Sequence, residues 1–328
     1  MSSLRESLKE VAGLISANQA FTVIGHTNPD GDTLGSTLAL GLGLQKMGKR
    51  VTLLNIDGVP EVYRFLPGSD RVVKPEAAHF PDQVVVCVDC SDPKRAGDEV
   101  IPWLAKARTV INIDHHISNA SFGTVNIVDP EAASAGIIIM ELLEKLGVGI
   151  DRDIATCLYV SLVTDTGSFR FSNTSPRAHR AAAKLLSTGL NQEAVNRELY
   201  EEVPLTGLQL IKAGLDNLQL SPCGKVAWMI FNRQVMESLN ARDEHLEGVV
   251  NYAKSIKGVE VGILFRESGE KLVKISFRSK SKVNVSDLAA KFGGGGHLRA
   301  AGCRYRVSLA EAVQNVVAAA LEAVQETK

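Results

Sequence analysis

One segment near the N-terminus, residues 21–36 (FTVIGHTNPDGDTLGS), constrains the fold more than any other. It begins with a run of apolar and β-branched residues, passes through a polar turn, and leads into a helix-compatible stretch. A buried strand, a turn and a helix form the repeating unit of open α/β sheets, which bind ligands beyond the carboxyl ends of their strands. The turn carries one imidazole and two carboxylates: His26, Asp30 and Asp32.

Two interpretations of this turn are open when it is taken alone. Carboxylates one residue apart repel each other unless a positive charge lies between them, and a metal ion supplies one. The alternative is an ordinary capped turn, because Asp32 and Thr33 both suit the start of a helix. A calcium loop of the EF-hand type is excluded, since the spacing provides no terminal glutamate.

The order of the expected elements predicts an α/β protein. Residues 1–185 alternate strands and helices, which is typical of a mostly parallel sheet covered on both faces. A helical linker is expected over 186–222 and a smaller α/β domain over 223–328. The expected strands of the first domain are 20–25, 50–55, 83–89, 109–113 and 124–128, and its helices are 3–17, 33–48, 97–106, 133–147, 151–163 and 176–188. In the second domain strands are expected at KVAWMIF, VEVGILF, KLVKISF and CRYRV, and helices over 245–256, 285–291 and 308–325.

Composition excludes several classes of protein. A hydrophobic content of 45% indicates a globular chain, and no apolar run reaches membrane-spanning length. The N-terminal stretch is amphipathic with mixed charge, unlike a signal peptide, so a cytoplasmic protein is expected. Five cysteines without a regular spacing form no disulfide framework. The net charge of −1 argues against a general nucleic-acid-coating protein, but residues 271–306 carry nine Lys or Arg and a single acid.

Metal-type side chains recur where other expected elements end. One apolar strand ends at Asp89, another at the run Asp114-His115-His116, and a helix ends near Asp165. Each of these endings alone is compatible with an ordinary polar turn. Together with the turn that carries His26, Asp30 and Asp32 they make four in one sheet, which are hard to explain in that way. Asp oxygens and imidazoles without thiolates favour Mn²⁺ or Mg²⁺ over structural zinc. The supply of ligands is too large for one ion and suits two ions about 3.5–4 Å apart, which activate water and hold a phosphoryl group.

These segments resemble a known family. HTNPDGDTLGS, VDCSDPKR, IDHH and TDTGSFRFSNTSPRAHRAA are similar to the four N-terminal motifs of the DHH phosphoesterase superfamily, and FRSKSKVNVSDLAAKFGGGGHLRAAG is similar to the signature of its DHHA1 domain. The resemblance covers nearly the whole chain. In its length and its short linker the chain resembles one branch of the superfamily, the nanoRNases and pAp phosphatases (bifunctional oligoribonuclease and PAP phosphatases). This branch is related to the longer RecJ-type exonucleases.

The resemblance implies roles for individual residues. One ion would be held by His26, Asp30 and Asp89. A second would be held by Asp32, Asp89, His115 and Asp165, so that Asp89 bridges the two ions. Among the expected catalytic residues, Asp114 would orient a histidine and His116 would face the scissile phosphate.

A glycine run in the second domain has two interpretations. It is a flexible turn in most proteins, and no Lys-Ser/Thr follows it as in a Walker loop. Four glycines between a helix and a strand would also expose successive N–H groups to an anion. The resemblance places Arg278, Gly294, Gly295, Gly296 and His297 in the substrate site, with Arg278 offering a bidentate fork to a phosphate.

The expected function follows from the resemblance. It implies a Mn²⁺-dependent phosphoesterase with two divalent ions that hydrolyses short RNA, such as the dinucleotide pApA, to mononucleotides, or 3′-phosphoadenosine 5′-phosphate (PAP) to AMP. The expected partners are short RNA oligonucleotides or phosphorylated nucleotides, with no membrane, and a homodimer is compatible with this expectation. The alternatives are a cyclic-dinucleotide phosphodiesterase and a non-catalytic, nucleotide-responsive regulatory protein. The complete ligand set favours catalysis.

Overall fold

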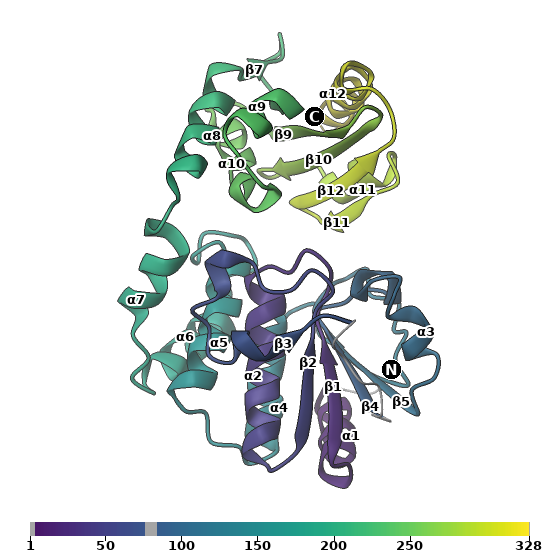
Figure 1. Ribbon diagram of the computed structural model, residues 1–328, viewed down its shortest axis with the longest axis vertical. Coiled ribbons are helices and arrows are strands. Elements are labelled where there is room, and N and C mark those ends of the chain that lie inside the picture. Colours follow the sequence, from purple (N-terminus) through teal and green to yellow (C-terminus); the bar gives the residue numbers. More distant parts are fainter. Residues whose placement is uncertain (1–3, 76–83, 328) are drawn as a thin grey trace. The chain divides into compact units, whose positions relative to one another are not determined.

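The protein forms two compact units that divide between Glu202 and Val203 (Figure 1). The structure is a computed structural model that describes residues 4–75 and 84–327, with the backbone alone for His297. The expected α/β class is confirmed, since each unit is built on its own sheet. None of the helices within the described ranges has the length and apolar character needed to cross a bilayer.

The first unit contains a parallel sheet, which has six strands among the described residues. The strands are β1 (Ala20–Ile24), β2 (Arg50–Leu54), β3 (Val72–Val73), β4 (Val84–Val88), β5 (Thr109–Asp114) and β6 (Val125–Val128). Their order is β3-β2-β1-β4-β5-β6, and each paired neighbour runs parallel. The order reverses between β1 and β4, and at such a switch point the strand ends diverge to leave a crevice for a ligand.

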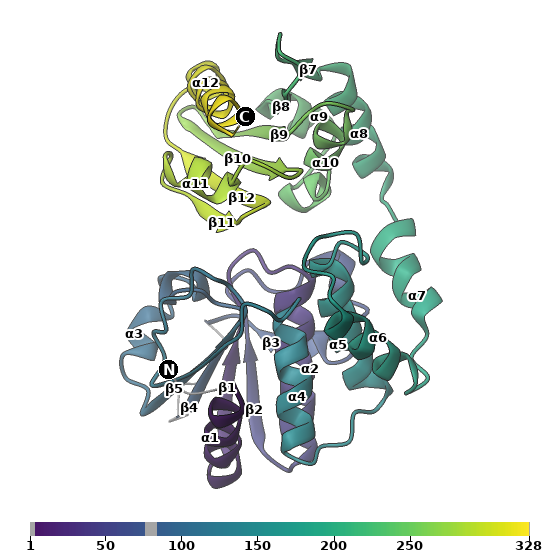
Figure 2. The same ribbon diagram turned by 180° about the vertical axis from the view of Figure 1, so that it is seen from behind.

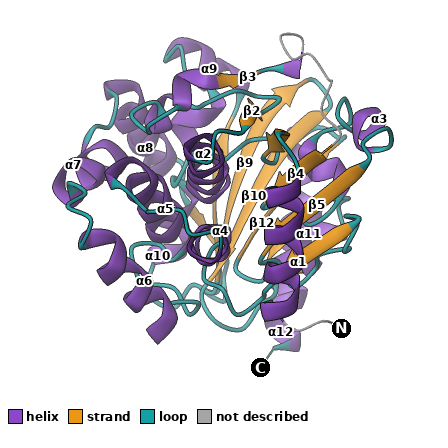
Figure 3. Cartoon of the chain, turned by 90° about the horizontal axis from the view of Figure 1, so that it is seen from below, coloured by secondary structure: helices purple, strands orange, loops and turns teal. Residues whose placement is uncertain are grey.

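Helices cover both faces of this sheet. They are α1 (Leu4–Ala17), α2 (Gly31–Lys46), α3 (Ile101–Leu104), α4 (Ala135–Lys145), α5 (Arg152–Asp165), α6 (Pro176–Leu186) and α7 (Gln192–Asn196), with the 3₁₀ turns η1 (Glu61–Tyr63), η2 (Ser69–Arg71) and η4 (Pro93–Ala96) and the π-helical turn η5 (Arg197–Glu201). Successive strand residues point to opposite faces. Phe21, Val23 and Val86 enter a core with α1, α2, α4 and α5, whereas Ile24 and Val85 face a smaller core that includes α3 (Figure 3).

The second unit contains a mixed sheet of β7 (Gln219–Leu220), β8 (Val226–Phe231), β9 (Val261–Gly269), β10 (Leu272–Ser279), β11 (Gly295–His297) and β12 (Ala300–Tyr305), in the order β11-β12-β10-β9-β8-β7. Of its described pairings, β8 with β9 is parallel and the others are antiparallel. Phe265 and Phe277 pack on one face with α11 (Val285–Ala290) and α12 (Leu309–Glu326). Met229 and Phe231 pack on the other face with α8 (Leu205–Asp216), α9 (Arg233–Ser238) and α10 (Val250–Ser255).

Two expected helices are interrupted. The range 97–106 contains only the short α3, preceded by η4, because Gly97 lies at φ +109°, which no helix accommodates. The range 245–256 is divided into the 3₁₀ turn η6 (Asp243–Leu246) and α10, because Gly248 between them lies at φ +76°. The first residue of each of the expected elements 3–17 and 83–89 lies outside the described residues. The three-part domain division stays a prediction.

Candidate metal centre

The predicted metal ligands converge at the switch point of the parallel sheet. His26, Asp30 and Asp32 lie between β1 and the first turn of α2, Asp89 follows β4, and His115 follows β5. Asp165 is the last residue of α5, which packs with α2 and α4 (Figure 2). Ligand atoms of these residues fall into two sets of three, within which all atoms lie within 4.8 Å of one another. The sets are His26, Asp30 and Asp89, and Asp32, His115 and Asp165.

The first set surrounds the Nε2 atom of His26. This nitrogen lies 3.4 Å from Asp89 Oδ2 and 3.8 Å from Asp30 Oδ2. Asp30 also caps α2, because its Oδ1 accepts a hydrogen bond from the Thr33 amide at 3.0 Å. The capped turn and the metal ligand are therefore compatible in one side chain: one carboxylate oxygen starts the helix and the other faces the imidazole.

The second set surrounds the Nε2 atom of His115. It lies 3.4 Å from Asp32 Oδ2, 3.8 Å from Asp165 Oδ2 and 3.6 Å from Asp89 Oδ1. Asp89 therefore directs Oδ2 toward the first set and Oδ1 toward the second. This is the geometry that a carboxylate needs to bridge two ions.

Both histidines are held in one orientation by the backbone. His26 Nδ1 lies 2.8 Å from the carbonyl oxygen of Thr27, and His115 Nδ1 lies 3.2 Å from that of Ala132. A carbonyl only accepts, so Nδ1 carries a proton in each ring, and Nε2 is the ring atom that faces the carboxylates and is left to bind an ion. This tautomer is the one that metal-binding imidazoles use when the other nitrogen donates to a carbonyl.

Asp89 occupies an uncommon backbone conformation. Its φ is +58°, in the left-handed region that non-glycine residues rarely adopt, and its amide donates to Ile113 O at 2.9 Å. Strain of this kind persists at sites where the surroundings fix the chain. The Thr33 hydroxyl donates to Asp89 Oδ2 at 2.6 Å, while the buried Oδ1 has no hydrogen-bond partner.

Asp32 is supported by the start of helix α4. Its Oδ2 accepts the amide of Ala135 at 2.8 Å, and its Oδ1 accepts the Ser161 hydroxyl at 2.6 Å and the Gly136 amide at 3.2 Å. Gly136 is required here, because a Cβ at that position would lie 2.0 Å from Ser161 Oγ. The close packing of α4 against α5 thus fixes the orientation of a ligand on α2.

Asp114 and His116 form a pair next to the ligands, with His116 Nδ1 3.5 Å from Asp89 Oδ1. His116 Nδ1–H donates to Asp114 Oδ1 at 2.7 Å, and both residues are buried. Asp114 Oδ2 accepts Asn119 Nδ2 at 2.5 Å, and Asp114 Oδ1 also accepts the His115 amide at 2.8 Å. The carboxylate is therefore held by three neighbours and fixes the orientation of the His116 ring.

The electrostatics of the cluster favour an additional cation. Burial raises the pKa of Asp165 to about 6. Repulsion from Asp30 and Asp89 also raises this pKa, and together these effects outweigh the attraction to His115, which lowers it. Burial and the charge of Asp89 raise the pKa of Asp32 well above its usual range. Burial lowers the pKa of His115, but the surrounding carboxylates outweigh burial and raise it to about 10. Asp32 and Asp165 thus lack sufficient positive charge, whereas the neighbouring histidines outweigh burial and lower the pKa of Asp89.

The donor set fits divalent ions. It consists of carboxylate oxygens and imidazole nitrogens, which suits Mn²⁺ and related ions. The buried Asp89 Oδ1, which lacks a hydrogen-bond donor, is a polar atom that an ion would satisfy. The nearby Cys87 lies in β4, where burial raises the pKa of its thiol to about 12, consistent with a packing role.

Four supporting residues were not identified from the sequence: Thr33, Asn119, Ser161 and Asn173. Asn173 Nδ2 donates to the Asp165 backbone oxygen at 3.1 Å and to its Oδ2 at 3.3 Å. Thr33, Asn119 and Asn173 lie in or near the quoted motifs, so position in the motif was an available signal. Ser161 lies inside an apolar helix, and only the tertiary contact with Asp32 shows its role.

The predicted substrate residues of the second unit lie on an interior strand and on the edge strand of its sheet. Arg278 lies on β10 opposite Ala300, and Gly295, Gly296 and His297 form the edge strand β11. The amides of Gly293 and Gly294 donate to Ala290 O at 3.1 Å and Ala289 O at 3.0 Å. Successive amides of the glycine run therefore do not all face a ligand. Gly295–His297 instead form an edge strand, in which alternate amides point away from the sheet.

Comparisons with known proteins agree with this arrangement. Residues 20–162 match the DHH family, N-terminal domain, and residues 228–326 match the DHHA1 domain. The bifunctional oligoribonuclease and PAP phosphatase NrnA of Thermus thermophilus is 32% identical over 323 residues, which cover 98% of this chain and 94% of that protein. The Bacillus subtilis protein of the same name is 28% identical, over 84% of this chain and 86% of that protein.

A solved structure supports the assignment across both units. An exopolyphosphatase-related protein from Bacteroides fragilis superposes with a TM-score of 0.90 and 28% identity, over 97% of this chain and 96% of that one. The chain belongs to the DHH family, with a DHHA1 domain following its DHH domain.

Proposed function

We propose that the protein is a two-metal phosphoesterase that hydrolyses short oligoribonucleotides such as pApA to mononucleotides, and PAP to AMP. The observation that carries this proposal is the position of Asp89, whose two oxygens face separate His–Asp sets at the switch point. The names of the Thermus and Bacillus relatives support the choice of substrate. Mn²⁺ is proposed as the ion because the donors are oxygen and imidazole nitrogen.

The proposed ligands are those expected from the sequence. His26, Asp30 and Asp89 would hold one ion, and Asp32, Asp89, His115 and Asp165 would hold the other. Bound ions would supply positive charge to the phosphoryl oxygens and acidify water for attack on phosphorus. Thr33, Ser161 and Asn173 would keep the carboxylates in place.

The Asp114–His116 pair would handle a proton at the phosphate. Water adds to phosphorus, the bond to the ribose oxygen breaks, and that oxygen then needs a proton. The buried Asp114 carboxylate accepts a hydrogen bond from His116 Nδ1 and orients the ring, so Nε2 is the atom that would serve that oxygen. Arg278, Gly295, Gly296 and His297 are proposed to bind the substrate end. The Gly294 amide donates to Ala289, so Gly294 would contribute by allowing close packing: a Cβ there would lie 2.2 Å from Gly302 O.

A substrate panel tests the proposal. Purified protein with Mn²⁺, with Mg²⁺ and after chelation is incubated with pApA, PAP and cyclic di-AMP, and the products are separated. Metal-dependent release of AMP from pApA and PAP is expected. Preference for cyclic di-AMP would establish the cyclic-dinucleotide alternative, and nucleotide binding without turnover would indicate a regulatory protein. The cytoplasmic location and the oligomeric state stay predictions.

A further inference from the structure

A basic residue without an assigned role, Arg95, lies on a turn next to the loop that carries His26. Arg95 belongs to η4, six residues after Asp89, and its carbonyl oxygen accepts the amide of Thr27 at 2.8 Å. Thr27 directly follows the predicted ligand His26. The backbone of Arg95 is therefore attached to the loop that holds the first ligand set.

The turn that carries Arg95 is fixed in position. Asp92 caps it by accepting the Lys94 amide at 2.8 Å, and the Gly97 amide donates to Lys94 O at 3.0 Å. Gly97 lies at φ +109°, and a Cβ there would lie 1.8 Å from Ile56 Cδ1. A side chain on such a turn starts from a defined position and loses less backbone entropy when it binds a ligand.

Arg95 has an unusual environment for an arginine. Its side chain is half-buried, yet among the described residues it makes neither an ion pair nor a hydrogen bond to protein. Partly buried guanidinium groups normally find a carboxylate or carbonyl partner, because removal from water without one is costly. The loop bound to the Arg95 backbone carries carboxylates of the metal cluster.

The backbone places the charge of Arg95 close to that cluster. The amide that binds the Arg95 carbonyl oxygen belongs to the residue after His26, and η4 follows the loop that carries Asp89. The Arg95 side chain therefore starts next to both the loop after β1 and the loop after β4.

A cation beside a two-metal centre repels the ions unless an anion lies between them. We propose that Arg95 is a substrate-binding residue that contacts the phosphate group held at the metal centre, on the side of His26. This inference rests on the proposed function. A planar guanidinium donates two parallel hydrogen bonds to phosphate oxygens, and a fixed cation near the transferring group stabilises the charge that develops there.

Two neutral variants separate this role from a general effect of charge. Arg95→Gln removes the proposed phosphate contact, and Lys94→Gln removes an exposed charge from the same turn. Metal content is measured first, and both variants are expected to keep the wild-type number of Mn²⁺ ions. Calorimetry with inorganic phosphate and with AMP then measures binding to the Mn²⁺-loaded proteins. Arg95→Gln should weaken both by about 10- to 100-fold, the loss expected for a charge-assisted hydrogen bond, with Lys94→Gln within about two-fold of wild type.

Kinetics on pApA complete the test. Arg95→Gln should lower kcat/KM by the same factor, and Arg95→Lys should recover part of it as a point charge. Equal behaviour of Arg95→Gln and Lys94→Gln, loss of metal from Arg95→Gln, or no phosphate binding by the wild type would overturn the inference. If the wild type binds phosphate through Arg95 but hydrolyses no substrate, the proposed function is wrong and the anion site stands.

Discussion

Asp89 has the most constrained position in the proposed metal centre. It combines a left-handed backbone, a short hydrogen bond from Thr33 and two oxygens that face different ligand sets. Every other predicted ligand binds only one of the two ions, so its loss leaves the ligand set of the other ion complete. Loss of the Asp89 carboxylate removes a ligand from both.

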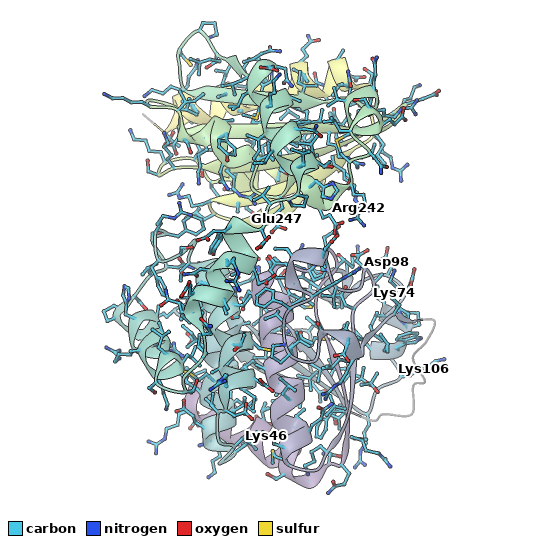
Figure 4. All side chains as sticks on the ribbon, turned by 60° about the vertical axis from the view of Figure 1, so that its left-hand side comes forward. Lys46, Lys74, Asp98, Lys106, Arg242 and Glu247 are labelled. Atoms are coloured by element: carbon cyan, nitrogen blue, oxygen red, sulfur yellow. The ribbon has the colours of Figure 1, made fainter. Side chains whose placement is uncertain are left out.

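We therefore expect Asp89→Asn to reduce turnover more than removal of any supporting residue. The reduction should exceed the roughly 10- to 100-fold typical of residues that only orient ligands. Metal titration should show at least one ion lost, with the fold retained by circular dichroism. Asp98→Asn is the matched control, because Asp98 is an exposed carboxylate nearby in the chain (Figure 4). If Asp89→Asn binds two ions with wild-type affinity, Asp89 does not bridge them.

Removal of the metal should also lower thermal stability. The ligand carboxylates are mostly buried and repel one another, and a bound cation offsets that repulsion in the folded state only. At an Mn²⁺ concentration ~100-fold above the dissociation constant, binding contributes ~2.7 kcal/mol. For a unit of this size that corresponds to an increase in Tm of about 5–10 °C over chelated protein. A scan with and without chelator measures it, and an unchanged Tm would count against an ion at this cluster.

At the scale of elements, the packing of α4 against α5 determines the ligand geometry on α2. The first two amides of α4 and the Ser161 hydroxyl of α5 all bind Asp32. A helix N-terminus favours a carboxylate, so this contact also offsets part of the cost of burying Asp32. Gly136 allows the two helices to approach closely enough.

Gly136→Ala should disrupt that contact. The new methyl group would displace Ser161, so we expect an overpacking cost of ~1–3 kcal/mol in the free energy of unfolding. Metal affinity should fall about 10- to 100-fold, because Asp32 loses support. Gly13→Ala makes the same replacement in α1 with nothing within 4 Å, and should raise stability by up to ~1 kcal/mol. Denaturant unfolding and metal titration of both variants check this, and unchanged metal affinity in Gly136→Ala would refute the role of the helix contact.

The same elements show how far the sequence predicts the structure. Strands β1, β2 and β4 lie within a residue of their expected bounds. β1 and β4 are buried almost throughout and appear as apolar runs, whereas β2 is buried only at its end. The two-residue β3 and the glycine-rich β11 have no such signal, since they are too short for a hydrophobic period. The helix breaks at Gly97 and Gly248 depend on positive φ angles that neighbouring residues do not reveal.

The residues of the candidate site also divide into those that the sequence predicts and those that it does not. His26, Asp89 and His115 follow directly from strand ends, so the topology of a parallel sheet brings them together. Ser161 could not be found in this way, because its position depends on helix packing, which local sequence patterns do not encode. Arg95 ends the quoted motif VDCSDPKR, so position in the motif was an available signal for it.

At the scale of the molecule, the two units carry different chemistry. The first contains the proposed metal centre and Arg95, while most of the positive charge of the second lies in residues 271–306, around Arg278 and β11. The net charge of the chain is −1. Binding of long nucleic acid depends on many phosphate contacts, so this distribution favours substrates of only a few nucleotides.

A length ladder of 5′-phosphorylated oligoribonucleotides tests the central claim most directly. Initial rates are measured with Mn²⁺ on dimers, trimers, pentamers and 24-mers, and again after chelation. We expect the highest kcat/KM for dimers to pentamers, with ~5 nucleotides as the upper limit from site-size arguments. We also expect a steep fall for the 24-mer and no turnover after chelation. Degradation of 24-mers as efficiently as dimers, or hydrolysis that survives complete removal of metal, would contradict it.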